Sequence, residues 1–157
     1  MGWEHVIPQF VVRMRKLLRP DCDSVRFPIQ GTGEQTRSFV FIDDFIDGLM
    51  TVMKRGEHLG IYNIGTQEEI TIAELARMTG EYFGKRVEVV PSPPALGGTL
   101  RRCPDTSKLA ALGYSPRVRL KDGLAVTAEW YNEHCDRAPA APGPTDKSEW
   151  QFWTQRR

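Results

Sequence analysis

The stretch GTGEQTRSFVFIDDF, residues 31–45, carries three local signals in a row. Two glycines at its start predict a turn, and residues 37–42 alternate as a β-strand does. Asp43 or Asp44 can then cap a helix reaching about Arg55, because a carboxylate accepts hydrogen bonds from the free N–H groups of a first turn. The sequence therefore predicts a turn, a strand and a helix here, and the aspartates need no catalytic role.

Short strands and helices also alternate on both sides of this stretch. Apolar periodicity, with caps and breakers at the ends, predicts helices at 6–18, 72–83, 106–112 and 122–134, strands at 25–30, 61–64 and 87–90, and a Pro/Gly-rich loop at 91–99. Pro28 is expected to break the first strand. The buried face of the helix after Asp44 is expected to consist of Phe45, Ile46, Leu49, Met50, Val52 and Met53. This pattern indicates an α/β fold.

Composition excludes several classes of protein. The 157 residues are 40% hydrophobic and 26% charged with net charge +1, which fits one domain or part of a larger one and predicts neither a nucleic-acid nor a membrane partner. Three scattered cysteines predict no disulfide framework and a reducing, cytoplasmic location. The three histidines lack metal-site spacing, so no metal site is expected.

Three arginines are the candidates for binding an anion. Arg37 follows a glycine turn and can hold a phosphate or carboxylate through two parallel N–H···O bonds, with backbone N–H groups at 31–33 as a small nest. The alternative is an ion pair with a nearby aspartate. Arg101 and Arg102 follow the Pro/Gly-rich loop and can add a second contact to the same anion, although two solvated side chains remain the alternative. Together the three suit a pyrophosphate better than a single carboxylate.

The segments GTGEQTRSFVFIDDFIDGL, YNIGTQEEITIAELA and RRCPDTSKLAALGYSPRVRLKDGLAVTAEWY, in this order, resemble a known family. They are similar to the C-terminal part of extended short-chain dehydrogenases/reductases, the NAD-dependent nucleotide-sugar epimerase/dehydratase family, with UDP-glucuronate decarboxylases closest in character. The opening MGWEHVIPQFVVRM resembles that family's substrate-contacting helix. The resemblance covers about 1–131. It implies a small mixed α/β substrate-binding domain at 1–135, without the Rossmann half, followed by an Ala/Pro-rich linker and aromatic, basic tail at 136–157.

The resemblance also implies roles for single residues. Arg37 matches the arginine that contacts the ribose and phosphates of the nucleotide, and Arg102 matches the one on the pyrophosphate, with Arg101 as a neighbouring candidate. Positions bordering the base or lying near the nucleotide are Phe27, Ile29, Gln30, Val6, Ile7 and Phe10. Packing is the first expectation for Val6, Ile7, Phe10 and Phe27.

The sequence departs from the family where the chemistry is performed. It contains no Gly-x-Gly-x-x-Gly and no Tyr-x-x-x-Lys, since none of the four tyrosines has a lysine four residues later. No catalytic or cofactor-binding residue can therefore be assigned, and NAD is expected only in a complete enzyme. The chain begins where the family's substrate domain begins, which predicts half an enzyme without turnover of its own.

Two functions follow as hypotheses. The first is the substrate-binding half of an NAD-dependent nucleotide-sugar epimerase, dehydratase or decarboxylase, which binds the diphosphate of a UDP-, GDP- or dTDP-sugar beside an N-terminal Rossmann partner. The alternative is a stand-alone, non-catalytic binding module that self-associates, for example as a homodimer, to cover apolar surface.

Overall fold

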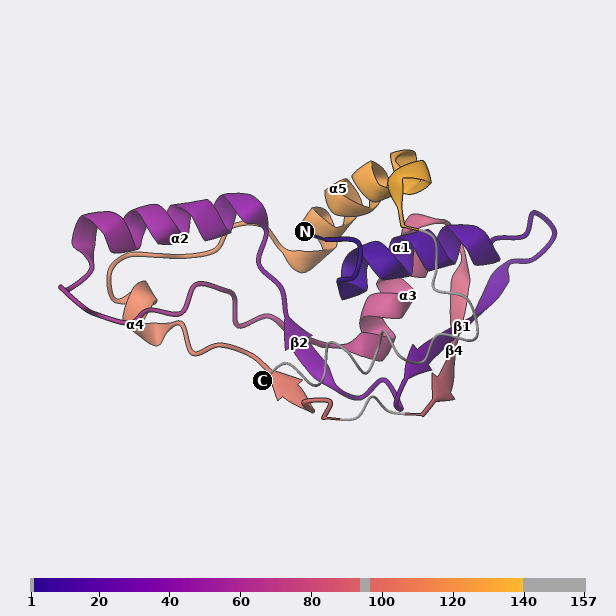
Figure 1. Cartoon of the computed structure of the whole chain (residues 1–157), viewed down its shortest axis with the longest axis horizontal. Helices are drawn as coiled ribbons and strands as arrows, with labels where there is room; N and C mark the ends of the chain where they lie inside the picture. The colour runs from indigo at the N-terminus through magenta and orange to yellow at the C-terminus, as the bar shows by residue number, and fades with distance from the viewer. Residues whose placement is uncertain (1, 94–96, 140–157) are drawn as a thin grey trace.

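The computed structural model describes residues 2–93 and 97–139. Figure 1 shows a body built from α1, α3, α5, β1 and β4, with α2 and α4 together at one end of the molecule. The elements in chain order are α1 Val6–Leu17, β1 Ser24–Gln30, β2 Thr36–Ser38, α2 Ile42–Arg55, β3 Glu69–Thr71, α3 Ile72–Tyr82, β4 Arg86–Ser92, β5 Arg101–Arg102, α4 Ser107–Ala110, α5 Leu120–Glu133 and the 3₁₀ helix η1 Cys135–Arg137. The fold is α/β, as predicted. Most of the predicted tail, residues 140–157, lies outside the described residues.

The body is organised around one parallel pair of strands. β1 and β4 pair from Ser24↔Arg86 to Gln30↔Ser92, and the side chains of β1 are alternately exposed and buried. The buried side of β1 joins residues of α1, α3 and α5 in one core cluster. Phe10 and Phe27 meet edge to face in this cluster, with ring centroids 5.0 Å apart. The members of the cluster are Ile7, Phe10, Met14, Val25, Phe27, Ile29, Ile72, Leu75, Ala76 and Leu124.

The predicted break at Pro28 is wrong, because β1 runs straight through it. The carbonyl of Pro28 accepts a hydrogen bond from the Arg13 guanidinium, so it points away from the paired strand. The nitrogen of the same residue points the same way, and the missing N–H removes no bond of the ladder. Proline is tolerated because β1 pairs on one side only in the described part of the chain.

A second sheet has the order β3-β2-β5. β2 pairs antiparallel with β3 and parallel with β5. The predicted strand at 61–64 does not form, and the strand predicted at 37–42 is confined to Thr36–Ser38. The helix that follows β3 is capped by Thr71, whose hydroxyl accepts the N–H of Glu74 at 3.1 Å.

Helix α2 differs from its prediction in both its start and its packing. It begins after Phe41 without a side-chain cap. Asp44 lies inside the first turn, is only 1% exposed, and accepts the N–H groups of Arg117 and Val118 at 2.9 Å each. The carboxylate thus ties α2 to the segment before α5 instead of capping the helix.

The predicted buried face of α2 is also wrong for five of its six members, and only Val52 is half-buried. Phe45, Ile46, Leu49, Met50 and Met53 are 40–71% exposed. The helix packs instead through Gly48, where a Cβ would come within 2.6 Å of the Ile64 side chain and 3.1 Å of the Tyr114 ring. Periodicity identified the apolar stripe correctly, but the small residue on the other side decides which face meets the rest of the described chain.

No helix in the described part of the chain is both long and apolar enough to cross a bilayer. Cys22, Cys103 and Cys135 are all free thiols. Within residues 2–93 and 97–139, no group of three or more acidic, histidine or cysteine side chains is placed to hold a metal ion.

Candidate functional site

Arg37 and Arg102 occupy paired positions on neighbouring strands. The register of β2 and β5 sets Arg37 opposite Arg102 and Thr36 opposite Arg101. Paired residues of adjacent strands point to the same face of a sheet, and successive residues of one strand point to opposite faces. Arg37 and Arg102 therefore share one face, which we call the arginine pair, while Arg101 lies on the other face.

The arginine pair has no carboxylate partner in the described part of the chain. Arg37 donates to the carbonyls of Thr36 at 2.6 Å and Thr99 at 2.8 Å, and more weakly to that of Leu100 at 3.4 Å. Among the described residues, Arg102 reaches only the Thr99 hydroxyl, at 3.5 Å. The alternative in which Arg37 pairs with a neighbouring aspartate does not occur in the structure.

The electrostatics of the pair reflect this arrangement. Partial burial lowers the pKa of Arg37, and the nearby positive charge of Arg102 lowers it further. Two cations held on one face without a neutralising acid create a local positive potential, which attracts an anion.

Arg101 is engaged on the opposite face. Its Nε lies 3.0 and 3.1 Å from the two carboxylate oxygens of Glu69, and its Nη2 lies 2.9 Å from Oε2. The Thr36 hydroxyl donates to the same carboxylate. A hollow of about 300 Å³ adjoins this ion pair and is lined by Gln67, Glu69, Arg101, Cys103, Pro104 and Asp105. Arg101 thus has its own anionic partner and does not join the arginine pair.

The pKa of Glu69 is expected to lie below that of an ordinary glutamate. The hydrogen bond from Thr36, followed by that from Arg101, holds the pKa of Glu69 below its ordinary value of 4.5. A carboxyl whose pKa is lower in the folded state stabilises the fold above its unfolded pKa, and this contribution is lost as pH falls through the folded value. Thr36→Val is expected to raise the pKa of Glu69 in a carbon-detected NMR titration, whereas Thr51→Ala should leave it unchanged. An unchanged Glu69 pKa in Thr36→Val would contradict the assignment of that hydrogen bond.

The remaining predicted residues lie at several places. Phe27 is fully buried and Ile29 is 2% exposed, both within the core, so neither side chain can reach a ligand without unpacking β1. Gln30 is exposed at the end of β1, where its carbonyl accepts the Gln35 amide at 2.7 Å. Val6 packs partly buried against the core. Phe10 is 4% exposed within the core.

The glycine turn after β1 has a structural role. Gly31 and Gly33 have φ angles of 71° and 86°, which favour glycine. The Gly31 N–H donates to the Ser92 carbonyl at 2.8 Å, so it is not free for the predicted anion nest. The turn joins the two sheets and brings the chain from β1 to β2.

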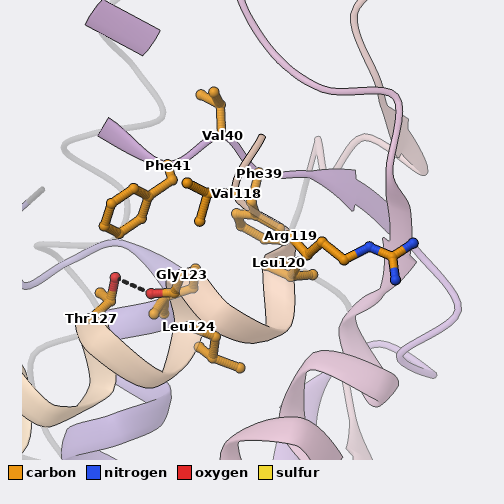
Figure 2. A pocket seen from close by; sticks show the side chains of 10 residues that line it. Phe39, Val40, Phe41, Val118, Arg119, Leu120, Gly123, Leu124 and Thr127 are labelled. Atoms are coloured by element: carbon orange, nitrogen blue, oxygen red, sulfur yellow. Dashed lines mark hydrogen bonds between the residues drawn. The ribbon is translucent and has the colours of Figure 1, made fainter. Parts of the chain in front are cut away.

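A second hollow, shown in Figure 2, was not anticipated from the sequence. It has a volume of about 40 Å³, little more than one water molecule occupies in the liquid. Ile7 and Leu124 line it on the body side, while Phe39, Val40 and Phe41 line it from the segment that enters α2. The Arg119 guanidinium extends away from the hollow. The apolar residues 39–41 could have indicated this hollow from the sequence, but they were assigned to the predicted strand at 37–42.

The described residues lack the arrangement that is typical of a dinucleotide site. Dinucleotide sites place the pyrophosphate where a strand leads through a glycine-rich turn into a helix. Within residues 2–93 and 97–139, no strand continues in this way: β1 leads to β2, and β3 runs directly into α3 with Thr71 as its cap.

Comparison with known proteins shows consistent similarity. The sequence model of the NAD dependent epimerase/dehydratase family matches residues 3–65. The chain is 35% identical over 134 residues to GDP-L-fucose synthase 1 of Arabidopsis thaliana, covering 85% of this chain and 41% of that protein. It is also 35% identical over 106 residues to UDP-glucuronic acid decarboxylase 4 of the same plant, covering 67% of this chain and 24% of the other.

A solved structure extends the similarity to the fold. The UDP-glucuronic acid 4-epimerase of Bacillus cereus, in complex with UDP-glucuronic acid and NAD, superposes with a TM-score of 0.72 at 25% identity. The match covers 84% of this chain and 41% of that one. The chain thus spans about two fifths of the length of the GDP-L-fucose synthase and of the 4-epimerase, and the match lies in the C-terminal part of such proteins.

Proposed function

Since the chain belongs to the NAD-dependent epimerase/dehydratase family, we propose that it is the part that holds the sugar nucleotide. In this proposal Arg37 and Arg102 bind the diphosphate of a UDP-, GDP- or dTDP-sugar. The observation that carries the proposal is the register of β2 and β5, which sets the two arginines side by side on one face.

The chemistry of the pair suits a diphosphate. Neighbouring strands lie about 4.8 Å apart, a spacing at which two guanidinium groups can contact adjacent phosphoryl groups of one ligand. A guanidinium donates two parallel N–H···O bonds to a phosphate, and such charge-assisted bonds are stronger than neutral ones. Arg101 is a weaker candidate because Glu69 already neutralises its charge.

In a complete enzyme of this family the chain would contribute binding and orientation. Contacts to the diphosphate lie away from the reacting sugar carbon, and remote binding energy of this kind positions the reacting atom. NAD would supply the hydride chemistry when bound by the rest of such an enzyme. The chain's own part is to hold the nucleotide and aim the sugar, so it is not catalytic alone.

The proposal can be tested with the purified chain. UDP-glucuronic acid, GDP-L-fucose and dTDP-glucose would each be titrated while the NMR signals of the arginine side chains are followed. We expect at least one sugar nucleotide to shift the signals of Arg37 and Arg102. The absence of any shift with all three ligands, or NAD-dependent turnover by the chain alone, would refute the proposal.

A second candidate is a self-associating, non-catalytic module. The exposed apolar side chains of α2 favour a protein contact of some kind. A tight dimer in a size-exclusion mass measurement, combined with no affinity for any of the three sugar nucleotides, would favour this candidate over the first.

A further inference from the structure

Helix α5 carries a group of aromatic side chains on its exposed side. The centroid of the Trp3 ring lies 6.1 Å from that of Trp130 and 4.8 Å from that of Tyr131. His134 stacks on Trp130, with ring centroids 4.4 Å apart and an angle of 17° between the ring planes. Val126 lies one turn before Trp130 on the same side of the helix. We call four of these side chains the aromatic face of α5: Trp3, Val126, Trp130 and His134.

The described residues leave this face partly open to solvent. Trp130 and Val126 are 47% and 58% exposed, whereas Tyr131 is only 5% exposed. Tyr131 instead joins Val11 and Ala128 in a core cluster between α1 and α5. An indole is highly buried on average in folded proteins, because its large apolar surface is unfavourable in water. The exposed half of Trp130 therefore suits a further apolar cover.

Unpaired acids border the aromatic face of α5. Glu129 and Glu133 are exposed and lie one turn apart, next to Trp130 on the helix. Within residues 2–93 and 97–139, neither of the two forms an ion pair. Glu4 adds negative charge nearby, since burial and then this carboxylate raise the pKa of Tyr131. A segment that covers the face should therefore combine aromatic with basic side chains.

Residues 148–157, SEWQFWTQRR, combine these two kinds of side chain. Trp150, Phe152 and Trp153 are the first phenylalanine or tryptophan residues after α5, and Arg156 and Arg157 follow them. Aromatic rings pack edge to face or offset-stacked, and a guanidinium donates two parallel N–H···O bonds to a carboxylate. The aromatic residues thus complement the exposed indole of α5, and the arginines complement the acids beside it.

The aromatic face of α5 is within reach of this segment. Residues 140–149 connect it to the described chain, and at about 3.3 Å per residue they can span roughly 30 Å. Trp130 lies only one turn, about 5.4 Å, before the end of α5 at Glu133. The other helix with exposed apolar side chains, α2, lies at one end of the molecule, away from η1 (Figure 1). Reach therefore favours α5 over α2 as the docking site.

We propose that the aromatic face of α5 is the docking site of residues 148–157 of the same chain. Trp150 and Trp153 pack on the exposed side of Trp130, and Arg156 and Arg157 pair with the acids on α5. A tether of this length raises the local concentration of the segment to about the millimolar range, so that weak contacts are sufficient. A second copy has to associate from solution and lacks this advantage. The inference does not depend on the proposed function.

Thiol labelling reports the cover directly. Val126→Cys places a thiol on the aromatic face of α5, and Met53→Cys on α2, at a position that is 71% exposed, is the control. Each is measured in the full chain and in the full chain with Trp150→Ser and Trp153→Ser. Circular dichroism checks that the fold is kept in every variant. Peptide mapping separates the new thiol from the three native ones, Cys22, Cys103 and Cys135.

We expect Val126→Cys to be labelled about tenfold faster once both tryptophans are replaced, which corresponds to a docking free energy of about 1.4 kcal/mol. The labelling rate of Met53→Cys should not change. An equal rate at Val126→Cys with and without the two tryptophans would overturn the proposal. Faster labelling at Met53→Cys instead would place the segment on α2 and would overturn it as well. Protection that grows with protein concentration, together with a doubled mass, would assign the cover to a second copy.

The charged contacts have a separate test. Arg156→Gln combined with Arg157→Gln should speed labelling of Val126→Cys about threefold at low salt and have little effect at about 1 M salt, because salt screens exposed charges. If these substitutions had no effect at low salt, the pairing with Glu129 and Glu133 would be wrong. None of these rates involves Arg37 or Arg102, so failure of the nucleotide-binding proposal would be seen separately.

Discussion

Arg102→Ala is expected to weaken binding of the sugar nucleotide about 10- to 150-fold. Hydrogen bonds to charged groups contribute roughly 1.5–3 kcal/mol each, and each 1.4 kcal/mol changes a dissociation constant about tenfold. The fold should tolerate the change, because within residues 2–93 and 97–139 the guanidinium makes a single long hydrogen bond, to Thr99. Isothermal titration of the wild type and the variant gives the ratio of dissociation constants.

Arg101→Ala is the matched control for this result. It removes the same charge one residue earlier on β5, but on the opposite face and from an ion pair with Glu69. We expect the dissociation constant of Arg101→Ala to stay within about threefold of the wild type. This substitution removes only a long-range attraction between the arginine and the ligand, and moderate salt screens that attraction. Equal losses in both variants would mean that general positive charge, rather than the arginine pair, attracts the ligand.

Asp44→Ala is expected to lower the free energy of unfolding by about 3–5 kcal/mol. The carboxylate is buried and accepts two backbone N–H groups, of Arg117 and Val118. Removing it leaves both donors without their partner, and each hydrogen bond to a charged group is worth roughly 1.5–3 kcal/mol. Urea denaturation followed by circular dichroism measures the change.

Two further variants separate the causes of that loss. Asp44→Asn keeps one acceptor oxygen and should lose about half as much stability. Asp43→Ala removes an exposed charge from the same helical turn and should stay within roughly 1 kcal/mol of the wild type. If Asp44→Ala also stayed within this range, the tie between α2 and the segment before α5 would not stabilise the fold.

Local pattern predicted the body of the molecule well. Apolar spacing placed α1 and α3 within one or two residues of their observed bounds. The reason is that both helices bury the stripe that periodicity identifies, against the same strand β1. Strand β4 was predicted at 87–90, but its predicted end is wrong, because the strand runs through Pro91 to Ser92.

Helix α2 shows where local pattern fails. Periodicity states which residues share a side of a helix, but the contacts of the remaining chain decide which side is covered. Gly48 and the buried Asp44 hold α2 by its less apolar side, and the described residues leave the stripe bare. The same long-range contact explains why Asp44 does not cap α2, because its carboxylate accepts backbone N–H groups more than 70 residues away.

The residues themselves predicted that Arg37, Arg101 and Arg102 contact one anion, and only the resemblance singled out Arg102 as the partner of Arg37. β5 has two residues and follows a loop, so it is too short to be recognised as a strand from the sequence pattern. Without its register, the sequence alone could not separate Arg102 from Arg101. Register separates them completely, since neighbouring residues of a strand face opposite ways and only one of the two meets Glu69.

The most direct test of the arginine pair compares nucleoside diphosphates with monophosphates. UDP, GDP and dTDP and their monophosphates would be titrated into the wild type, Arg37→Gln and Arg102→Gln; glutamine retains donors for the carbonyls that Arg37 contacts. The account predicts that the wild type binds its preferred diphosphate at least tenfold more tightly than the monophosphate, and that each substitution brings the two dissociation constants close to equality. The same preference for the diphosphate in both variants as in the wild type would contradict it.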